Sequence, residues 1–553
     1  MQAQRSRTTQ LLVILALAFL LVTALPFACW WGASRLRTGL APAEATLRLA
    51  YSPEKGELLR ALLEDFEAQG LKTSTGSTMK VVAEEMLPER MTAPAVAGEL
   101  DAVCPDSSFW LTAIDQAWQE QSLDGGTLVG ESVRFAISPV VIAIREEVAR
   151  SMGHPQRHLG WADILDKARN DPGFEWSHAS TSTASGLLAT LAQFYAGAGK
   201  TRGLTIEDAT RQATLDYVAA VEATVKHYGE GELATVMMAL EEGALGLDAF
   251  VVQEQLVVYY NARSSEKLVA VYPAEGTLWE DHPLALLESA GLTVEARETF
   301  QALKRYLLLP EAQQAVLSHG YRPADLSLSL TASGSPLTAS NGVDPAQPQT
   351  VLQMPSPAVV QVVRDVWWYT KRHTNVFLVV DVSGSMAGDK LENARAGLLS
   401  FLGGMKGDDE RVGLVQFSGS VGGMMPLNEL GRNRQALAAA IANLNAGGNT
   451  ALLDGIATAY AQLQGLGDRD RINAIVVMTD GRENASRVGL RELQRRIREG
   501  NRDGVPVFIF CIGYGRDADM DMLRAIAETS GGQVREGDLL SIEELYRLIS
   551  TYF

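Results

Sequence analysis

A short segment of the sequence, DVSGSM at residues 381–386, presents one carboxylate and two hydroxyls on alternate residues directly after the apolar run NVFLVV. A threonine hydroxyl follows in the glycine-rich segment NAGGNTALLDG, and a second carboxylate follows in the segment MTDGREN. The oxygen-bearing side chains of these segments are those of Asp381, Ser383, Ser385, Thr450 and Asp480. Without thiols or imidazoles, such ligands suit hard divalent cations. We therefore expect a metal site, with Mg²⁺ favoured and Mn²⁺ or Ca²⁺ as alternatives.

The charge of this set indicates what a bound metal would recognise in turn. Only Asp381 and Asp480 carry a negative charge, so a divalent ion held by the five residues remains electron-poor. Such an ion favours an anionic oxygen from outside as its last ligand. The sequence therefore predicts a docking point for the carboxylate of a partner molecule.

Alternating strands and helices over residues 373–553 must position these side chains. Apolar runs predict strands at 375–382, 411–417, 472–479 and 505–513, and amphipathic runs predict helices at 389–402, 433–444, 452–463 and 488–500. This alternation is typical of a mostly parallel sheet covered by helices on both faces. Ligands bind such sheets beyond the carboxyl ends of the strands, where all three polar segments are expected to meet.

The motifs DVSGSM, NT at 449–450 and TDG at 479–481 resemble the metal-ion-dependent adhesion site of von Willebrand factor type A domains. The resemblance covers roughly residues 374–553 and implies a Rossmann-like fold. It also implies that Ser383, Ser385 and Thr450 bind the metal directly and that the two aspartates act through water. An acidic residue of a partner protein would then complete the coordination shell.

Residues 46–325 show a second α/β pattern, with a predicted strand at 46–51 followed by a helix that begins at Ser52. The stretch 132–144 predicts strand pieces broken at Ser138 and Pro139, and 294–309 predicts a late helix. The segments AYSPEKGELLRALLEDF, SPVVIAI and LVAVYPAEGTLWEDHPLALL resemble a bacterial extracellular solute-binding domain of the two-lobed periplasmic type.

That resemblance implies a cleft between two lobes but fixes no ligand residues by motif. Hydroxyls and backbone N–H groups at helix starts cradle small anions in such clefts, so a small, anionic solute is the expected ligand. The candidates are Ser52, Ser77, Thr78, Ser107, Thr183 and Ser185. Ordinary helix caps and turn residues are the alternative interpretation of the same positions.

The N-terminal region, residues 1–45, predicts a cytoplasmic stub, a single transmembrane helix at about 9–31 and a spacer. Its core is almost wholly apolar and close to the ~20 residues that span a bilayer, with arginines before it and tryptophans at its end. A cleaved signal peptide and a lipid anchor on Cys29 are alternatives, although both processing sites are poor. We expect the N-terminus inside and the body outside the cell membrane.

The remaining composition sets limits on function. The net charge of −18 argues against nucleic acid as a partner. The segment 326–372 is rich in Ser, Pro, Gly and Asn before a helix-start signal at Ser356 and Pro357, which predicts a linker and a connecting helix. No nucleophile elbow, nucleotide loop or histidine–zinc motif occurs in the sequence, so no enzymatic activity is expected.

Together these features predict a membrane-anchored extracytoplasmic binding protein. The domain at 373–553 would capture an acidic protein partner through its metal, and the domain at 46–325 would bind a small solute or act as an interaction platform. The alternative is a tethered solute receptor for an ABC-type transporter, with the type A domain as an accessory.

Overall fold

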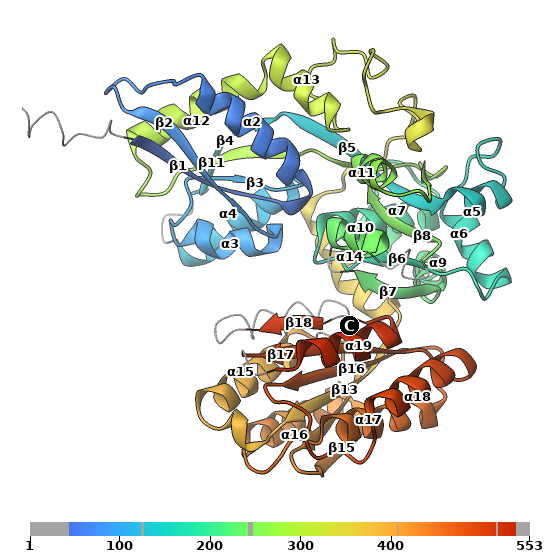
Figure 1. Ribbon diagram of the computed structural model, residues 1–553. Helices are drawn as coiled ribbons and strands as arrows, with labels where there is room; N and C mark the ends of the chain where they lie inside the picture. Colours follow the sequence, from blue (N-terminus) through green and yellow to red (C-terminus); the bar gives the residue numbers. More distant parts are fainter. Residues whose placement is uncertain are drawn as a thin grey trace, which may run out of the picture.

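The computed structural model describes residues 44–122, 126–229, 231–241, 247–405, 407–515, 518–532 and 534–537. They form two lobes, which lie side by side, and a C-terminal domain beneath the second lobe (Figure 1). The predicted anchor at about 9–31 lies outside the described residues. Within the described ranges, no helix is both long enough and apolar enough to cross a membrane.

Lobe 1 is a five-stranded sheet in the order β2-β1-β3-β11-β4. The strands are β1 (Glu44–Tyr51), β2 (Thr78–Glu85), β3 (Ala102–Cys104), β4 (Val129–Arg134) and β11 (Pro283–Leu287). The helices are α2 (Gly56–Ala68), α3 (Pro88–Val96), α4 (Phe109–Gln121), α12 (Val294–Leu307) and α13 (Pro310–Ser318), with a 3₁₀ turn η1 at Pro53–Lys55. The first predicted helix thus starts as a 3₁₀ turn at Pro53 and becomes α-helical at Gly56.

Lobe 2 has the strand order β10-β5-β8-β6-β7, with β9 and β12 also paired to β5. Its strands are β5 (Ala136–Arg145), β6 (Trp176–Ala179), β7 (Val225–Gly229), β8 (Ala249–Gln253), β9 (Leu268–Val271), β10 (Trp279–Glu280) and β12 (Arg322–Pro323). Its helices are α5 (Glu146–Ser151), α6 (Trp161–Asn170), α7 (Ala184–Ala198), α8 (Ile206–Thr210), α9 (Gln212–Glu222), α10 (Glu232–Glu241) and α11 (Glu254–Arg263).

The predicted strand break at Ser138 and Pro139 is wrong. Both residues lie inside β5, where Pro139 pairs with Trp279 of the short edge strand β10. The break falls instead at Phe135, where the chain crosses from lobe 1 to lobe 2. Pro139 has no backbone N–H to donate. It is tolerated in β5 because the neighbouring strand β10 has only two residues and does not need a hydrogen bond from every residue opposite it.

The segment between β12 and the connecting helix differs from the unpacked linker that its composition predicts. Leu337, Val343 and Leu352 are buried against lobe 2. Its backbone is also paired, since Thr277 N–H donates to the Thr350 carbonyl (3.0 Å) and Ala270 N–H donates to the Gly342 carbonyl (2.7 Å). Three spaced apolar residues and satisfied backbone hydrogen bonds therefore hold this polar segment, residues 324–356, against lobe 2. We call this segment the strap.

The C-terminal domain confirms the predicted mostly parallel sheet, with the order β15-β14-β13-β16-β17-β18 and β15 antiparallel. Its strands are β13 (Thr374–Asp381), β14 (Arg411–Phe417), β15 (Val421–Glu429), β16 (Ile472–Thr479), β17 (Val507–Tyr514) and β18 (Val534–Gly537). Its helices are α15 (Asp389–Gly404), α16 (Leu430–Ala442), α17 (Leu452–Leu466), α18 (Leu490–Asp503) and α19 (Met520–Ser530). The predicted strands and helices are all present, whereas β15, β18 and α19 were not predicted.

The connecting helix α14 (Pro357–Thr370) joins lobe 2 to the C-terminal domain. One hydrophobic cluster runs from lobe 2 through α14 into the sheet of the C-terminal domain. Trp367 of α14 packs edge-on against Tyr228, with ring centroids 5.2 Å apart. The Arg372 guanidinium then donates to the Val225 carbonyl of lobe 2 (3.0 Å) and to the Arg469 carbonyl of the C-terminal domain (2.6 Å). The two units are therefore packed together.

A buried ion pair fixes the entry into the C-terminal domain. The Lys371 ammonium lies 3.0 Å from a Glu410 carboxylate oxygen, and both side chains are completely buried. Glu410 also accepts hydrogen bonds from Thr374 N–H (2.6 Å) and the Thr374 hydroxyl. Burial opposes ionisation of Glu410, but Lys371 and the hydrogen bonds outweigh it and lower the pKa of this carboxyl to about 2.

We expect the variant Lys371→Met to lower the free energy of unfolding by about 3–5 kcal/mol, because it leaves a buried carboxylate without its ammonium. Lys80→Met is the matched control, since Lys80 forms an exposed pair with Glu44 at 3.4 Å. That change should cost less than about 1 kcal/mol. Guanidinium denaturation of both variants at pH 7 measures the difference, and equal losses would refute the role of the pair.

Glu410 also predicts a pH dependence of stability. Its folded pKa of about 2 lies below its ordinary value of 4.5, so its contribution is present above about pH 4.5 and is lost as the pH falls towards 2. The shift corresponds to about 3 kcal/mol. Between pH 5 and pH 2.5, unfolding of Glu410→Gln should therefore depend less on pH than unfolding of the wild type by about this amount. Parallel curves would contradict the assignment.

Candidate metal site and interlobe cleft

The first carboxylate of the predicted metal site stands at the carboxyl end of the central strand β13. All eight residues of this strand are buried, and so is the Asp381 side chain. One Asp381 oxygen accepts a hydrogen bond from Ser383 N–H (2.7 Å), and the other accepts one from the Thr479 hydroxyl. Burial raises the pKa of Asp381, against the opposing effect of these hydrogen bonds. A cation beside Asp381 would favour its ionised form.

The second carboxylate, Asp480, ends the neighbouring strand β16 and is also fully buried. The Ser385 hydroxyl donates to one Asp480 oxygen (2.7 Å), and the Ser385 and Ser383 hydroxyl oxygens lie 3.0 Å apart. The Lys390 ammonium, in the first turn of α15, contacts the other Asp480 oxygen. These contacts form a connected set from Asp381 to Asp480.

Thr450 reaches the same edge from the loop before α17. Its backbone N–H donates to the Asn484 side-chain oxygen (2.9 Å), and its carbonyl accepts from the N–H groups of Asn484 (3.0 Å) and Ala485 (3.1 Å). A Cβ atom added at Gly481 would lie 3.0 Å from the Thr450 hydroxyl and 3.4 Å from the Ser385 hydroxyl. Glycine at 481 therefore keeps a small space open beside both hydroxyls.

The donor set and its spacing fit a small hard cation. Two oxygens bound at right angles to one Mg²⁺ at ~2.1 Å are about 3.0 Å apart, which is the separation of the Ser383 and Ser385 hydroxyls. The Thr450 hydroxyl borders the small space beside Gly481, as the Ser385 hydroxyl does. The structure thus brings together all five residues that the sequence predicts for the metal site.

Two residues at this site were missed by the sequence-based prediction. Thr479 orients Asp381, and its position immediately before Asp480 at the strand end could have identified it. Lys390 contacts Asp480 from the helix that follows the DVSGSM motif. Its position in the first turn of that helix could have identified it.

The interlobe cleft lies at the carboxyl ends of β1 and β3 and has a volume of about 290 Å³. Two of the six predicted solute ligands, Thr183 and Ser185, line it at the start of α7. Ser52 and Ser107 are buried next to its lining residues Pro53 and Asp106.

Ser77 and Thr78 lie far from this cleft. Thr78 pairs with Glu44 at the amino end of β1, whereas the cleft is at the carboxyl end of that strand. Seven steps along a strand place the two ends about 23 Å apart. Ser77 instead belongs to the turn that precedes β2, where Thr73 donates to its carbonyl and the Thr75 hydroxyl contacts its hydroxyl.

Carboxylates, which the sequence-based prediction did not include, dominate the polar lining of the cleft. Those in its walls are Glu54, Glu89, Asp106 and Glu232. Glu54 lies three residues after the end of β1 and Asp106 two residues after the end of β3, so the strand-end argument that located Asp381 could have located them. An acidic lining does not favour the anionic solute that the hydroxyls and helix starts predicted.

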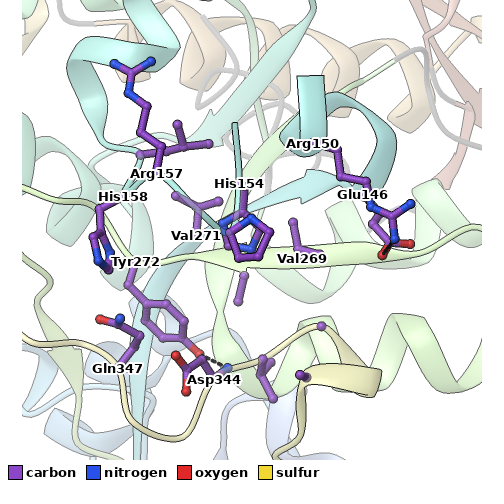
Figure 2. Close-up of a pocket in the computed structure, with 16 residues that line it drawn as sticks. Glu146, Arg150, His154, Arg157, His158, Val269, Val271, Tyr272, Asp344 and Gln347 are labelled. Carbon is purple, nitrogen blue, oxygen red and sulfur yellow. Dashed lines mark hydrogen bonds and ion pairs between the residues drawn. The ribbon is translucent and has the colours of Figure 1, made fainter. Parts of the chain in front are cut away.

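A second pocket, of about 350 Å³, lies on lobe 2 between α5, the loop that follows it, β9 and the strap (Figure 2). Its charged side chains are largely paired, because Arg150 contacts Glu146 (2.5 Å) and Arg157 contacts Asp163. Tyr272 points towards the strap and accepts a hydrogen bond from Asp344 N–H (3.2 Å). This pocket therefore marks where the strap packs on the lobe.

Two protein families match this chain in succession. The bacterial extracellular solute-binding protein family matches residues 47–322, and the von Willebrand factor type A domain family matches residues 375–546. The two matches correspond to the two lobes and to the C-terminal domain, respectively.

Relatives and solved structures show similarity to one domain at a time. Inter-alpha-trypsin inhibitor heavy chain H4 of Sus scrofa is 27% identical over 186 residues, and heavy chain H1 of Bos taurus is 30% identical over 176 residues. These alignments cover 32% and 30% of this chain and 20% and 19% of the relatives, so the chain spans about a fifth of their length.

Among solved structures, the sulfate-binding protein SubI from Mycobacterium tuberculosis H37Rv is 18% identical, with a TM-score of 0.37, and covers 52% of this chain and 88% of its own. A von Willebrand factor type A protein from Catenulispora acidiphila is 22% identical, with a TM-score of 0.29, and covers 33% of this chain and 43% of its own.

Type A domains commonly bind divalent cations, and an extracellular solute-binding domain indicates an extracytoplasmic body. Both families are generally non-enzymatic. This chain therefore combines a bacterial extracellular solute-binding domain with a von Willebrand factor type A domain, an architecture that supports an extracytoplasmic binding or adhesion role.

Proposed function

We propose that this protein is anchored at the cell membrane by its N-terminal segment and captures an acidic protein partner through a divalent cation in its type A domain. Asp381, Ser383, Ser385, Thr450 and Asp480 hold the cation, with Mg²⁺ favoured. A carboxylate of the partner supplies the remaining ligand. The observation that carries this proposal is the convergence of these five side chains, from three separate segments, at one edge of the sheet.

The location of the site supports this role. Thr374 begins β13 at the end of the domain that contacts lobe 2 through α14 and Arg372, and Asp381 ends the same strand. Seven strand steps separate the two residues by about 23 Å. The proposed metal site therefore lies at the opposite end of β13 from the contact with lobe 2.

A specific observation favours a second role, that of a solute receptor. The cleft of about 290 Å³ is enclosed by residues from both lobes, such as Pro88 of lobe 1 and Leu233 of lobe 2. A cavity of this size is appropriate to a small molecule. In this proposal the two-lobed domain binds a solute, and a transporter that receives the solute is the alternative partner of the chain.

Calorimetric titration with Mg²⁺ and Mn²⁺ tests the metal site. Thr450→Val replaces one hydroxyl by a methyl group, and we expect it to weaken metal binding at least tenfold because one oxygen ligand is lost. Thr458→Val is the matched control, since the Thr458 hydroxyl only donates to the Asp454 carbonyl within α17 (2.7 Å). It should leave metal affinity unchanged.

Repeating the titration with acetate, a minimal carboxylate, tests capture itself. If the bound metal keeps an open coordination position, acetate should occupy it. We therefore expect acetate to strengthen metal binding by the wild type. Absence of metal binding both with and without acetate would exclude a metal-bridged partner.

Glycine 481 provides an independent prediction. We expect Gly481→Ala to weaken metal binding several-fold, because the new methyl group would lie 3.0 Å from the Thr450 hydroxyl and close to that of Ser385. Gly489→Ala is the control on the same loop, because nothing lies within 4 Å of the Cβ position at Gly489. Equal metal affinities of the two variants would show that the space beside Gly481 is not part of the site.

A further inference from the structure

Four carboxylates gather around the interlobe cleft from both lobes. Glu54 and Asp106 come from lobe 1, and Glu232 comes from the start of α10 in lobe 2. Glu280 of β10 lies behind Glu232, and Gln253 joins the two, because its backbone N–H donates to Glu232 (3.1 Å) and its side-chain amide donates to Glu280. All four carboxylates are buried or nearly so, since Glu54 retains only 7% of its side-chain exposure.

Lys55 offsets only part of this negative charge. Its ammonium lies 3.0 Å from Glu54 and also donates to the Cys104 carbonyl (3.1 Å). His282 lies 3.8 Å from Glu54, but burial lowers the pKa of its imidazole well below the ordinary value, so the ring is neutral. A single ammonium does not balance four carboxylates. The described groups therefore leave more acidic groups than basic groups at the cleft.

Within the part of the chain that the structure describes, three of the carboxylate oxygens accept no hydrogen bond. They are Asp106 Oδ1, Glu232 Oε1 and Glu280 Oε1, and each is buried. Asp106 and Glu232 are each only 8% exposed, and both line the cavity. Leaving a buried acceptor without a partner is energetically unfavourable, and more so when the acceptor is charged. Two such acceptors in the walls of one cavity indicate a ligand that donates hydrogen bonds.

The shape of the cleft separates an organic ligand from a metal ion. Its volume of about 290 Å³ is roughly ten times the ~30 Å³ that one water occupies in the liquid. Its apolar lining is formed by Pro53, Leu87, Pro88, Leu233, Ala234 and Met237. A bare or hydrated metal ion gains nothing from such side chains, whereas an organic body buries its apolar surface against them.

We propose that the interlobe cleft binds a small organic cation, whose ammonium or guanidinium head group donates to Asp106 and Glu232 while its apolar body packs against Leu87, Leu233 and Met237. The inference rests on the proposed solute-binding role of the two-lobed domain and names the class of solute. It replaces the anionic solute expected from the sequence, because the carboxylates in the cleft would repel an anion.

The protonation of the cleft carboxyls supports this assignment. Burial raises the pKa of Glu232 to about 7, and burial together with the neighbouring carboxylates raises those of Asp106 and Glu280 well above their ordinary values. A cation that binds there displaces protons, so its affinity should rise with pH through 7. The titratable groups that interact with Glu232 are Glu54, Asp106, Glu280 and Tyr321. Lys55 and Glu89 interact with Asp106, and His282 interacts with Lys55.

The test is calorimetric titration of the full chain with 1,4-diaminobutane, agmatine and choline, with 1,4-butanediol as the neutral probe and sulfate as the anion. We expect at least one cation to bind, and Asp106→Asn and Glu232→Gln each to weaken it tenfold or more. Both substitutions keep the side-chain shape and remove a buried charge, and a thermal melt of each variant confirms folding. Glu146→Gln is the matched control, because Glu146 lines the other pocket and pairs with Arg150.

Each other outcome overturns the inference in a distinguishable way. Binding of sulfate without binding of any cation shows that the domain binds a solute of the opposite charge. Silence of every probe contradicts the solute-binding role itself. Binding of Mg²⁺ or Ca²⁺ alone that Asp106→Asn weakens and Thr450→Val leaves unchanged identifies the cleft as a metal site.

Discussion

The burial of carboxylates is the constraint on which both the architecture and the sites depend. A buried carboxylate needs a cation or several donors, because burial disfavours its charged form. Where another residue of the chain supplies the cation or the donors, the buried pair stabilises the fold. Glu410 meets Lys371 at the entry to the type A domain, and Glu254 receives two hydrogen bonds from Arg322 (2.8 and 2.7 Å) where β12 closes lobe 2. These pairs define where one domain ends and the next begins.

The same constraint underlies the proposal that two other groups of carboxylates are binding sites. At the edge of the type A sheet, Asp381 and Asp480 have hydroxyls and one contact from Lys390, but they and the serine oxygens still surround a position suited to a cation. In the interlobe cleft, Asp106 and Glu232 each keep an oxygen that accepts no hydrogen bond from the described residues. Both sites thus attract positive charge. The first uses closely spaced oxygens that suit a small ion, and the second combines carboxylates with apolar walls that suit an organic cation.

The sequence predicted the type A domain in more detail than the rest of the chain, for physical reasons. β13 and β16 are buried on both faces, so they appear as continuous apolar runs, and the chemistry lies immediately after them. Edge strand β15 was missed because it is only partly buried and contains two glycines and Pro426. The strap was predicted as a linker because Leu337, Val343 and Leu352 are isolated among polar residues, and only their three-dimensional partners show that they are buried. The solute ligands were predicted from hydroxyls only, so the carboxylates Asp106 and Glu232 were overlooked. Asp106 follows the end of a strand and Glu232 begins a helix, which are the same kinds of position as those of the predicted hydroxyls.

The connecting helix determines how the two sites are related in space. α14 and Arg372 pack the type A domain against lobe 2, while Arg364 of the same helix lies over the Phe109 ring of lobe 1 at 5.6 Å. A change in the angle between the lobes would therefore carry the type A domain with lobe 2 and alter the contact at Phe109. The metal ligands all belong to the type A domain, so such a movement would change where the metal site points and leave its internal geometry intact. Under the proposed roles, a solute that changes the angle between the lobes would reorient the metal site without changing the arrangement of its ligands.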